Sequence, residues 1–348
     1  MALIDPDICK AKTLPSRFYT TEESFQSLLP HFEGWQFAAH RSDISENNML
    51  PLHHIEEING ECMALVNSDQ IRCLSNVCTH RGMRLVMEEC NSKKIRCGYH
   101  GRSFDLDGSF SHMPKFEGVI GFPTADDNLT NYRLEEWMGL LFTSVKDSQF
   151  PDLSILEDRI GWIDIASFIR DTTKDRDYAI AADWALYCEN YLEGFHVPYV
   201  HPELHSVIEH DDYRVEVFDG GVLQTGIARD GEECFNIPES SPDCGQKIAA
   251  YYIWLFPNLM LNLYPWGLSI NIVVPVSSGK CRVLYRGYVK DDRSEEAGAG
   301  GDLDTVETQD QWVVEAVQRG LRSRSYDRGR YSPSMEVGVH HFHRLLTK

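Results

Sequence analysis

The sequence predicts an α+β protein made of two consecutive parts, a small all-β module and a larger antiparallel sheet with helices on one side. From Glu46 to Val145, short β-like runs alternate with turns rich in Gly, Asn and Asp. Longer, aromatic-rich strand candidates follow between residues 213 and 289, and residues 304–324 have the texture of a helix. A chain of 348 residues has room for two or three domains.

Residues 1–38 are expected to form an N-terminal helical segment that begins its helix at Thr20 or Thr21 and packs on the second domain. Residues 39–148 are expected to form the β module, and residues 149–348 the second domain. Within that domain, helical texture at 153–170 and 179–192 precedes strand candidates at 213–218, 221–228, 251–263, 268–276 and 281–289. Residues 291–303 are charged and glycine-rich, which predicts an exposed loop before the last helix.

Composition excludes several classes of protein. Hydrophobic residues make up 42% and charged residues 25%, which is ordinary for a folded core. The 53 acidic and 33 basic residues give a net charge of −20, so we expect neither a nucleic-acid nor a membrane partner. This charge is compatible with a basic or electron-delivering partner protein.

The distribution of apolar residues and cysteines predicts a cytoplasmic protein. The most apolar stretch, Tyr251–Tyr264, is too short to cross a bilayer as a helix, and the first residues lack an apolar leader. Ten cysteines fall far below the density of a disulfide scaffold. In a reducing compartment, Cys and His at short spacing indicate a metal site.

Four such residues stand in two short motifs of the β module: Cys78 and His80 in CTH, and Cys97 and His100 in CGYH. Two thiolates and two imidazoles suit either a tetrahedral zinc ion or a Rieske [2Fe–2S] cluster. Structural zinc sites usually pair like ligands, whereas each motif here holds one ligand of each type. Because each loop can then reach both irons, the arrangement favours the Rieske cluster over zinc or a coincidental core set.

A second group of candidate ligands lies in the segment CENYLEGFHVPYVHPELH, which contains His196 and His201. Two His and one carboxylate form the facial triad of non-haem Fe(II) oxygenases. Residues five apart are rotated by about 140° on a regular helix, so we expect Pro198 to break the helix and bring the second imidazole round. The alternatives are a helical zinc pair of His201 and His205, which Pro202 disfavours, and ordinary core or surface histidines.

The predicted third ligand is Asp310. It lies between Val306 and Val313 on an apolar stripe that continues to Val317 and Leu321. A carboxylate that faces a core is costly unless it is paired or bound to a metal, so a buried salt bridge is the alternative. Glu307 and Glu315 are less well placed on this helix, and Asp304 at its start is interpreted as a cap.

Both motif groups together resemble the Rieske non-haem iron oxygenases, the α subunits of the ring-hydroxylating oxygenase family, over nearly the whole chain. The resemblance rests on CTHRG with CGYHG, on ENYLEGFHVPYVHPEL and on QDQWVVEAVQRGL. It implies an N-terminal Rieske domain and a C-terminal helix-grip, START-like domain that holds a mononuclear Fe(II). It also implies a homotrimer, in which the cluster of one subunit serves the iron of the next.

The same resemblance implies an external electron source. Electrons would come from NAD(P)H through a separate flavin/iron–sulfur reductase, with or without a ferredoxin. The chain has no GxGxxG motif after a strand, which agrees with an external donor.

Glu193 is the predicted catalytic carboxylate outside the ligand set. In the family, a carboxylate three residues before the first iron His bridges to a cluster His across the subunit interface, and Glu193 stands at that position before His196.

Glu193, the YLEGFH context and the tail RGRYSPSMEVGVHHFHRLL resemble the branch with choline, glycine-betaine and carnitine monooxygenases. This branch implies a quaternary ammonium or N-methyl substrate, which would be hydroxylated or demethylated. Aromatic rings would hold such a cation, although sheet core is the alternative for each candidate: Tyr251, Tyr252, Trp254, Phe256, Tyr264 and Trp266. The alternative functions are hydroxylation of an aromatic ring, a Rieske electron carrier and a zinc-stabilised binding module.

Overall fold

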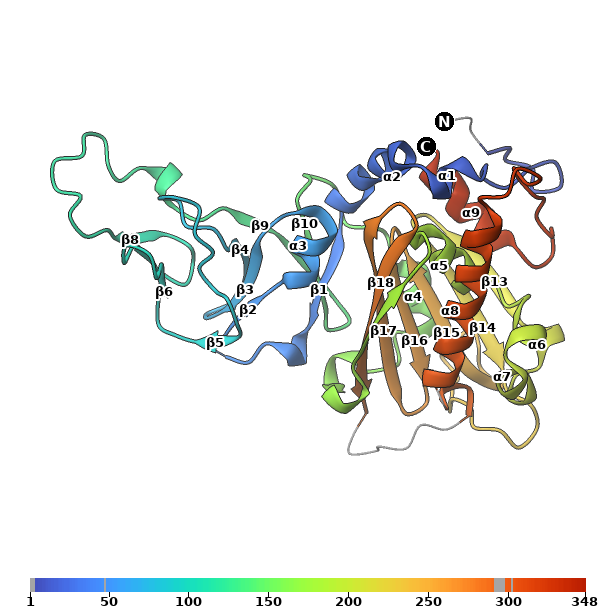
Figure 1. Ribbon diagram of the computed structural model, residues 1–348. Coiled ribbons are helices and arrows are strands. Elements are labelled where there is room, and N and C mark those ends of the chain that lie inside the picture. Colours follow the sequence, from blue (N-terminus) through green and yellow to red (C-terminus); the bar gives the residue numbers. More distant parts are fainter. Residues whose placement is uncertain (1–3, 47, 291–297, 302) are drawn as a thin grey trace. The chain divides into compact units, whose positions relative to one another are not determined.

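The computed structural model describes residues 4–46, 48–290, 298–301 and 303–348, which form two compact units (Figure 1). One unit comprises Phe32–Phe150, and the other combines Met1–His31 with Pro151–Lys348. Residues 32–38, which we had grouped with the N-terminal helical segment, thus fall in the β unit.

The β unit is built on two antiparallel sheets. The larger has seven strands in the order β1-β10-β9-β4-β3-β2-β5, and the smaller has the order β6-β7-β8. Buried aliphatic residues between the strands form its core, and one helix, α3 (His53–Asn59), packs beside β3. The strands are β1 (Gln36–His40), β2 (Asn48–Pro51), β3 (Met63–Asn67), β4 (Ile71–Ser75), β5 (Cys90–Asn91), β6 (Ile95–Arg96), β7 (Ser103–Phe104), β8 (Phe110–His112), β9 (Asn131–Trp137) and β10 (Leu140–Ser144).

The second unit contains one antiparallel sheet in the order β11-β18-β17-β16-β15-β14-β13, with β12 also paired to β18. Its central strands β16 and β17 are buried along almost their whole length. This burial is expected for a sheet with helices packed on one face. The strands are β11 (Ile169–Arg170), β12 (Arg176–Ile180), β13 (Arg214–Phe218), β14 (Gly221–Ile227), β15 (Ile248–Leu255), β16 (Leu259–Tyr264), β17 (Gly267–Ser277) and β18 (Lys280–Val289).

The apolar stretch 251–263, which we predicted as a single strand, forms two strands instead. A turn at 256–258 separates β15 from β16, and Tyr252 then pairs with Asn262. Pro257 cannot donate a ladder hydrogen bond, and the Asn258 side chain donates to the carbonyl of Val273 at 2.9 Å, which fixes the turn. This hairpin places two pocket-lining strands side by side.

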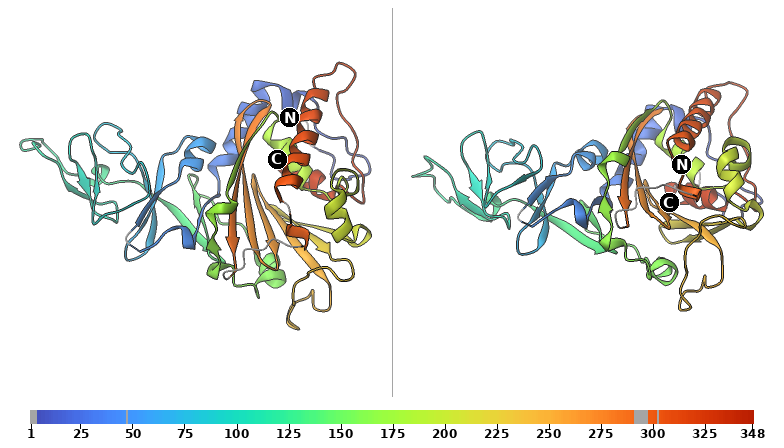
Figure 2. Two further views of the ribbon diagram at one scale, coloured as in Figure 1. Left: turned by 60° about the horizontal axis from the view of Figure 1, so that its bottom comes forward. Right: turned by 90° about the horizontal axis from the view of Figure 1, so that it is seen from below.

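Three helices lie on one face of this sheet: α5 (Trp184–Tyr191), α8 (Leu303–Gly320) and α9 (Val337–Leu346). Figure 2 gives two further views of the sheet and its helices. The predicted helical stretch 153–170 is helical in two pieces, α4 (Ser154–Ile160) and a 3-10 turn at Ile165–Ser167, and ends in β11. The predicted helical stretch 179–192 begins within β12 and continues as α5. In the described part of the chain, no helix is both long and apolar enough to span a membrane.

The N-terminal residues form α1 (Arg17–Thr20) and α2 (Glu22–Leu28), and Thr21 caps α2 as predicted. These residues pack against the helical layer of the second unit. One hydrogen bond between them runs from Gln318 of α8 to the carbonyl of Tyr19, at 3.1 Å. Most of the predicted loop at 291–303 lies outside the described residues.

Candidate functional site

The two Cys/His motifs form two tight turns of the β unit. In each turn a glycine amide donates back to the cysteine carbonyl, Gly82 to Cys78 at 2.9 Å and Gly101 to Cys97 at 3.1 Å. Both glycines have positive φ, +72° and +76°, which side chains with a Cβ rarely adopt. The local sequence therefore folds each motif around its own pair of candidate ligands.

The two turns bring like side chains together, His80 to His100 and Cys78 to Cys97. The rings of His80 and His100 have their centroids 4.9 Å apart, and Cys78 and Cys97 are each only 2% exposed. Burial raises the pKa of the Cys78 thiol, and the neighbouring Cys97 thiol raises this pKa further. Nδ1 of His100 is buried without a hydrogen-bond partner among the described residues. Such an unsatisfied nitrogen is costly unless something binds it, so the donor set and this atom fit a [2Fe–2S] cluster.

His196 and His201 flank a short helix, α6 (Val197–Val200), which is followed by α7 (Pro202–Val207). Our expectation that Pro198 breaks a helix is wrong in detail: each proline stands in the first turn of a new helix, where its missing N–H is not needed. The chain changes direction at His201, and the two imidazole rings come to 5.0 Å between centroids.

The alternative zinc pair of His201 and His205 is not formed. A helical turn does connect the two residues, since the His205 amide donates to the His201 carbonyl at 2.8 Å, contrary to our expectation for a chain with Pro202 between them. However, the His205 ring packs near His210, with centroids 6.1 Å apart, whereas His201 faces α8.

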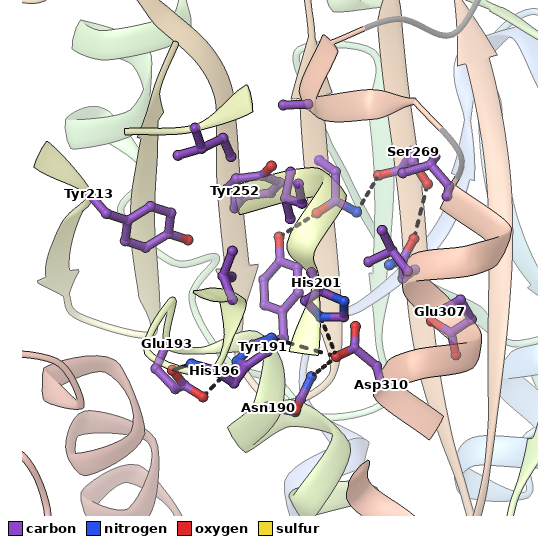
Figure 3. Close-up of a pocket in the computed structure, with 18 of the residues that line it drawn as sticks. Asn190, Tyr191, Glu193, His196, His201, Tyr213, Tyr252, Ser269, Glu307 and Asp310 are labelled. Atoms are coloured by element: carbon purple, nitrogen blue, oxygen red, sulfur yellow. Dashed lines mark hydrogen bonds and ion pairs between the residues drawn. The ribbon is translucent and has the colours of Figure 1, made fainter. Parts of the chain in front are cut away.

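His196, His201 and Asp310 form one cluster, with a ligand atom from each within 4.8 Å of the others. Oδ1 of Asp310 lies 2.9 Å from Nε2 of His201 and 3.6 Å from Nε2 of His196 (Figure 3). His196 precedes α6, His201 follows it, and Asp310 lies on α8. Two imidazole nitrogens and a carboxylate that face one point are a donor set that fits Fe(II) and leaves coordination positions open.

A second layer of hydrogen bonds holds each of these side chains. Glu193 Oε1 lies 2.7 Å from Nδ1 of His196, and Gln309 Oε1 lies 2.6 Å from Nδ1 of His201. Both oxygens accept, so each Nδ1 carries its proton and each Nε2 can bind a metal. Asn190 Nδ2 donates to Oδ1 of Asp310 at 2.6 Å.

Sequence reasoning missed Asn190 and Gln309, although both stand inside the motifs that carry the ligands. A polar side chain next to a candidate ligand in the same motif could have indicated a hydrogen-bond partner of that ligand. The structure places Glu193 beside His196, while its predicted bridge to another subunit stays a prediction.

The cluster opens into a pocket between the sheet and helices α5 to α8. Cross-strand pairing brings polar side chains of three strands to the same face, since Asn262 of β16 is the partner of both Tyr252 on β15 and Ser269 on β17. Six tyrosines contribute rings to the wall: Tyr187, Tyr191, Tyr213, Tyr252, Tyr264 and Tyr285.

Of the six aromatic residues that we proposed for a cation cage, Tyr252 and Tyr264 line this pocket and the others do not. Tyr251 faces the opposite side of the sheet, where its hydroxyl donates to Asp243 at 2.9 Å. Trp254 packs on Phe342 of α9, with ring centroids 5.1 Å apart. Tyr251 and Tyr252, neighbours on β15, thus point to opposite faces, whereas Trp254 shares the face of Tyr252 but lies under α9.

Glu307 is not part of the three-residue cluster, but the sequence did not predict its burial in the pocket. It is 2% exposed and lines the pocket, whereas Val317 of the proposed apolar stripe is 43% exposed. The hydroxyl of Tyr187 donates to Glu307 Oε2 at 2.5 Å, and the Tyr285 hydroxyl donates to the same oxygen. Burial raises the pKa of Glu307 to about 7, although these two hydrogen bonds act to lower it.

The other two carboxylates of α8 lie away from the pocket. Glu315 accepts a hydrogen bond from the Ala181 amide at 3.0 Å. Asp304, which we interpreted as a cap, lies inside α8 and accepts from the Tyr178 hydroxyl at 2.7 Å.

Comparison with known proteins assigns the family. Residues 34–123 match the Rieske [2Fe-2S] domain, and residues 170–348 match the ring hydroxylating alpha subunit (catalytic domain). The chain belongs to the ring-hydroxylating oxygenase α subunits. Membership confirms the α+β fold of Rieske and catalytic domains and the oxygenase class predicted from the motifs. The roles of the individual site residues stay predictions.

The relatives fall in the branch that the sequence resembles. The carnitine monooxygenase oxygenase subunit of Escherichia coli K12 is 31% identical, over 97% of this chain and 94% of its own. The chloroplastic choline monooxygenase of Arabidopsis thaliana is 28% identical, over 97% of this chain and 82% of its own.

Solved structures share the fold. A quaternary ammonium Rieske monooxygenase in complex with L-carnitine superposes with a TM-score of 0.80 at 23% identity, over 99% of both chains. Naphthalene 1,2-dioxygenase from Rhodococcus bound to indole gives 0.75 at 18% identity, over 96% of this chain and 93% of that one.

The raised pKa of Glu307 predicts a pH-dependent stability. A carboxyl whose pKa is raised on folding favours the folded state at low pH and costs stability as pH rises towards its folded pKa of about 7. In chelator-treated protein, where no cation occupies the His196 cluster, Glu307→Gln should stabilise the catalytic unit increasingly from pH 5 to pH 8, by up to about 3 kcal/mol. Urea unfolding at several pH values measures this, with Glu315→Gln as the control on the same helix. A difference between Glu307→Gln and the parent that does not change with pH would contradict the assignment.

Proposed function

We propose that this chain is the oxygenase component of a Rieske system that oxidises a quaternary ammonium or N-methyl compound, by hydroxylation or by demethylation through an unstable hydroxymethyl product. The observation that carries the proposal is the joint presence of the His196, His201 and Asp310 cluster and a tyrosine-walled pocket that also contains a buried carboxylate. Tyrosine faces and carboxylates attract cations. The names of the carnitine and choline monooxygenase relatives support the same substrate class.

In this proposal Cys78, His80, Cys97 and His100 hold the [2Fe–2S] cluster, and His196, His201 and Asp310 hold the mononuclear Fe(II). When bound, the two groups supply electrons and the O2 chemistry that attacks a C–H bond. Zinc in place of the cluster is disfavoured by the family match of residues 34–123.

The chain's own residues orient the ligands and shape the pocket. Glu193 and Gln309 accept hydrogen bonds from Nδ1 of His196 and His201, and so hold both imidazoles with Nε2 towards Asp310. Asn190 fixes the carboxylate from α5. The tyrosine rings exclude water around the substrate and can contact a cationic methylammonium group with their faces.

We infer a homotrimer in which Glu193 couples the iron site of one subunit to the cluster of its neighbour. Glu193 binds both the amide and Nδ1 of His196, which leaves it next to a candidate iron ligand. Inter-subunit electron transfer is described for a solved quaternary ammonium Rieske monooxygenase of similar fold. Electrons would reach the trimer from NAD(P)H through a separate flavin/iron–sulfur reductase, and the cytoplasmic location also stays a prediction.

Hydroxylation of an aromatic ring is the alternative within the same chemistry. It is disfavoured because a purely apolar ring would bring no positive charge to the buried carboxylate of Glu307. The likeness to naphthalene dioxygenase concerns the fold alone.

Substrate-stimulated O2 uptake tests the proposed function. The purified chain, NADH and a surrogate reductase should consume O2 faster when a methylated ammonium compound is added, and formaldehyde or a hydroxylated product should accumulate. Aromatic acids serve as the comparison panel. Stimulation by aromatic acids alone would overturn the substrate class while leaving the oxygenase family intact.

Asp310→Ala should remove about one iron per chain and abolish turnover, because the remaining two imidazoles bind Fe(II) weakly. The visible spectrum of the cluster should survive, since its predicted ligands lie in the other unit. Asp304→Ala is the matched control, since Asp304 is a carboxylate of the same helix that lies outside the pocket. Full activity of Asp310→Ala would mean that another residue is the third ligand.

Glu193→Gln should leave both metals bound and slow electron transfer between them. The substitution keeps the shape but places an amide NH2 where one carboxylate oxygen accepts from His196. Oxidation of the cluster in a single turnover with substrate and O2 should slow by about tenfold or more. Glu203→Gln, on the exposed side of α7, is the control. An unchanged rate with a small loss of thermal stability would reduce Glu193 to a structural role.

A further inference from the structure

The charge of the substrate pocket is strongly one-sided. Its described lining includes three carboxylates, from Glu193, Glu307 and Asp310, and no Lys or Arg. Glu193 and Asp310 already face His196 and His201. Glu307 is therefore the lining carboxylate that no histidine engages among the described residues.

Glu307 is held as an acceptor without a counter-charge. Both tyrosine hydroxyls donate to Oε2, and Gln311 Nε2 donates to Oε1 at 3.1 Å. Three neutral donors favour the ionised carboxylate, whereas its burial favours the neutral form. No Lys or Arg stands among the described residues that line the pocket with it. A positively charged ligand beside Glu307 would supply the missing charge.

The wall beside Glu307 is polar but neutral. Asn262, Ser269 and Asn271 are each at most 5% exposed and line the pocket from β16 and β17. Ser269 donates to Asn271 Oδ1 at 3.1 Å, and Asn262 Oδ1 accepts from Tyr191 at 2.9 Å. Amides and a hydroxyl can hydrogen-bond an alcohol or carbonyl of a ligand, but they cannot neutralise a carboxylate.

We propose that Glu307 is the counter-charge for the substrate's ammonium group, and that the pocket selects cations with a neutral polar end over zwitterions that carry a carboxylate. This inference rests on the proposed function, whose ammonium class it narrows. A zwitterion would bring a carboxylate into a pocket whose described lining holds three carboxylates, and that carboxylate would lose its hydration with no Lys or Arg of the described lining to pair with. A cation with a hydroxyl meets Glu307 at one end and neutral donors and acceptors at the other.

Three probes of nearly equal size separate charge from shape. Choline is a cation with a hydroxyl, glycine betaine replaces the alcohol by a carboxylate, and 3,3-dimethylbutan-1-ol keeps the shape of choline without its charge. Binding to the oxidised holoenzyme is measured by isothermal titration calorimetry without a reductase, so no turnover contributes. We expect choline to bind about tenfold or more tightly than either of the other two.

Variants assign the selectivity to Glu307. Glu307→Gln keeps an acceptor for the two tyrosines and removes the charge, so it should weaken choline binding about tenfold or more. The affinity for 3,3-dimethylbutan-1-ol should stay within twofold, because that ligand has no charge to pair. Glu315→Gln, on the same helix but bonded to Ala181 outside the pocket, should leave the affinities for all three probes unchanged.

The outcomes are distinguishable. If glycine betaine binds as tightly as choline, or if Glu307→Gln weakens choline and the neutral alcohol equally, the inference is overturned while the ammonium class survives. If no ammonium compound binds, or if none stimulates O2 uptake, the proposed function fails and this inference fails with it.

Discussion

A half-buried carboxylate between two imidazoles is the interaction on which the rest of the catalytic unit depends. Asp310 reaches His196 and His201 only because α8 packs along α5 and because two prolines restart the helix on either side of His201. The docking of α8 is itself polar: Asn190 of α5 donates to Asp310, and Gln318 accepts from the Asp183 amide at 2.8 Å. One helix pair therefore fixes the carboxylate ligand and contributes Tyr187 and Glu307 to the pocket wall.

The same helix pair carries an energetic cost that only function explains. Tyr187 and Glu307 face each other between α5 and α8 and bury an acid whose neutral form the fold prefers. An apolar pair at these positions would pack with less electrostatic cost. Ligand-binding sites often retain a locally unfavourable group because the bound ligand supplies its missing partner. A cationic substrate would supply the positive charge that Glu307 lacks.

The sequence predicted the residues of the metal sites more completely than the residues that line the pocket. CTH with CGYH, and two His with a carboxylate on an amphipathic helix, are chemical patterns that survive any error in secondary structure. Glu307 escaped because helix α8 presents its buried face through Glu307, Val314 and Gln318 rather than through the valines that suggested the stripe. A buried acid that is satisfied by tyrosines from other segments leaves no periodic signal in its own helix.

Backbone details also needed the tertiary structure. Pro198 and Pro202 read as helix breakers, but each begins a helix, a choice that the sequence alone does not make. We predicted the apolar run from Tyr251 as one strand, although Pro257 and Asn258, which mark the turn between β15 and β16, interrupt it. Which of its rings enter the pocket follows from strand register, which is set by pairing with distant residues.

We expect one chain to hold a Rieske cluster in one unit and a separate Fe(II) in the other. Iron and acid-labile sulfide analysis of the purified protein, before and after incubation with Fe(II) and removal of the excess, measures the content of both sites. The expected result is about three irons and about two sulfides per chain. About two irons and two sulfides would reduce the chain to an electron carrier, and zinc without sulfide would contradict both metal assignments.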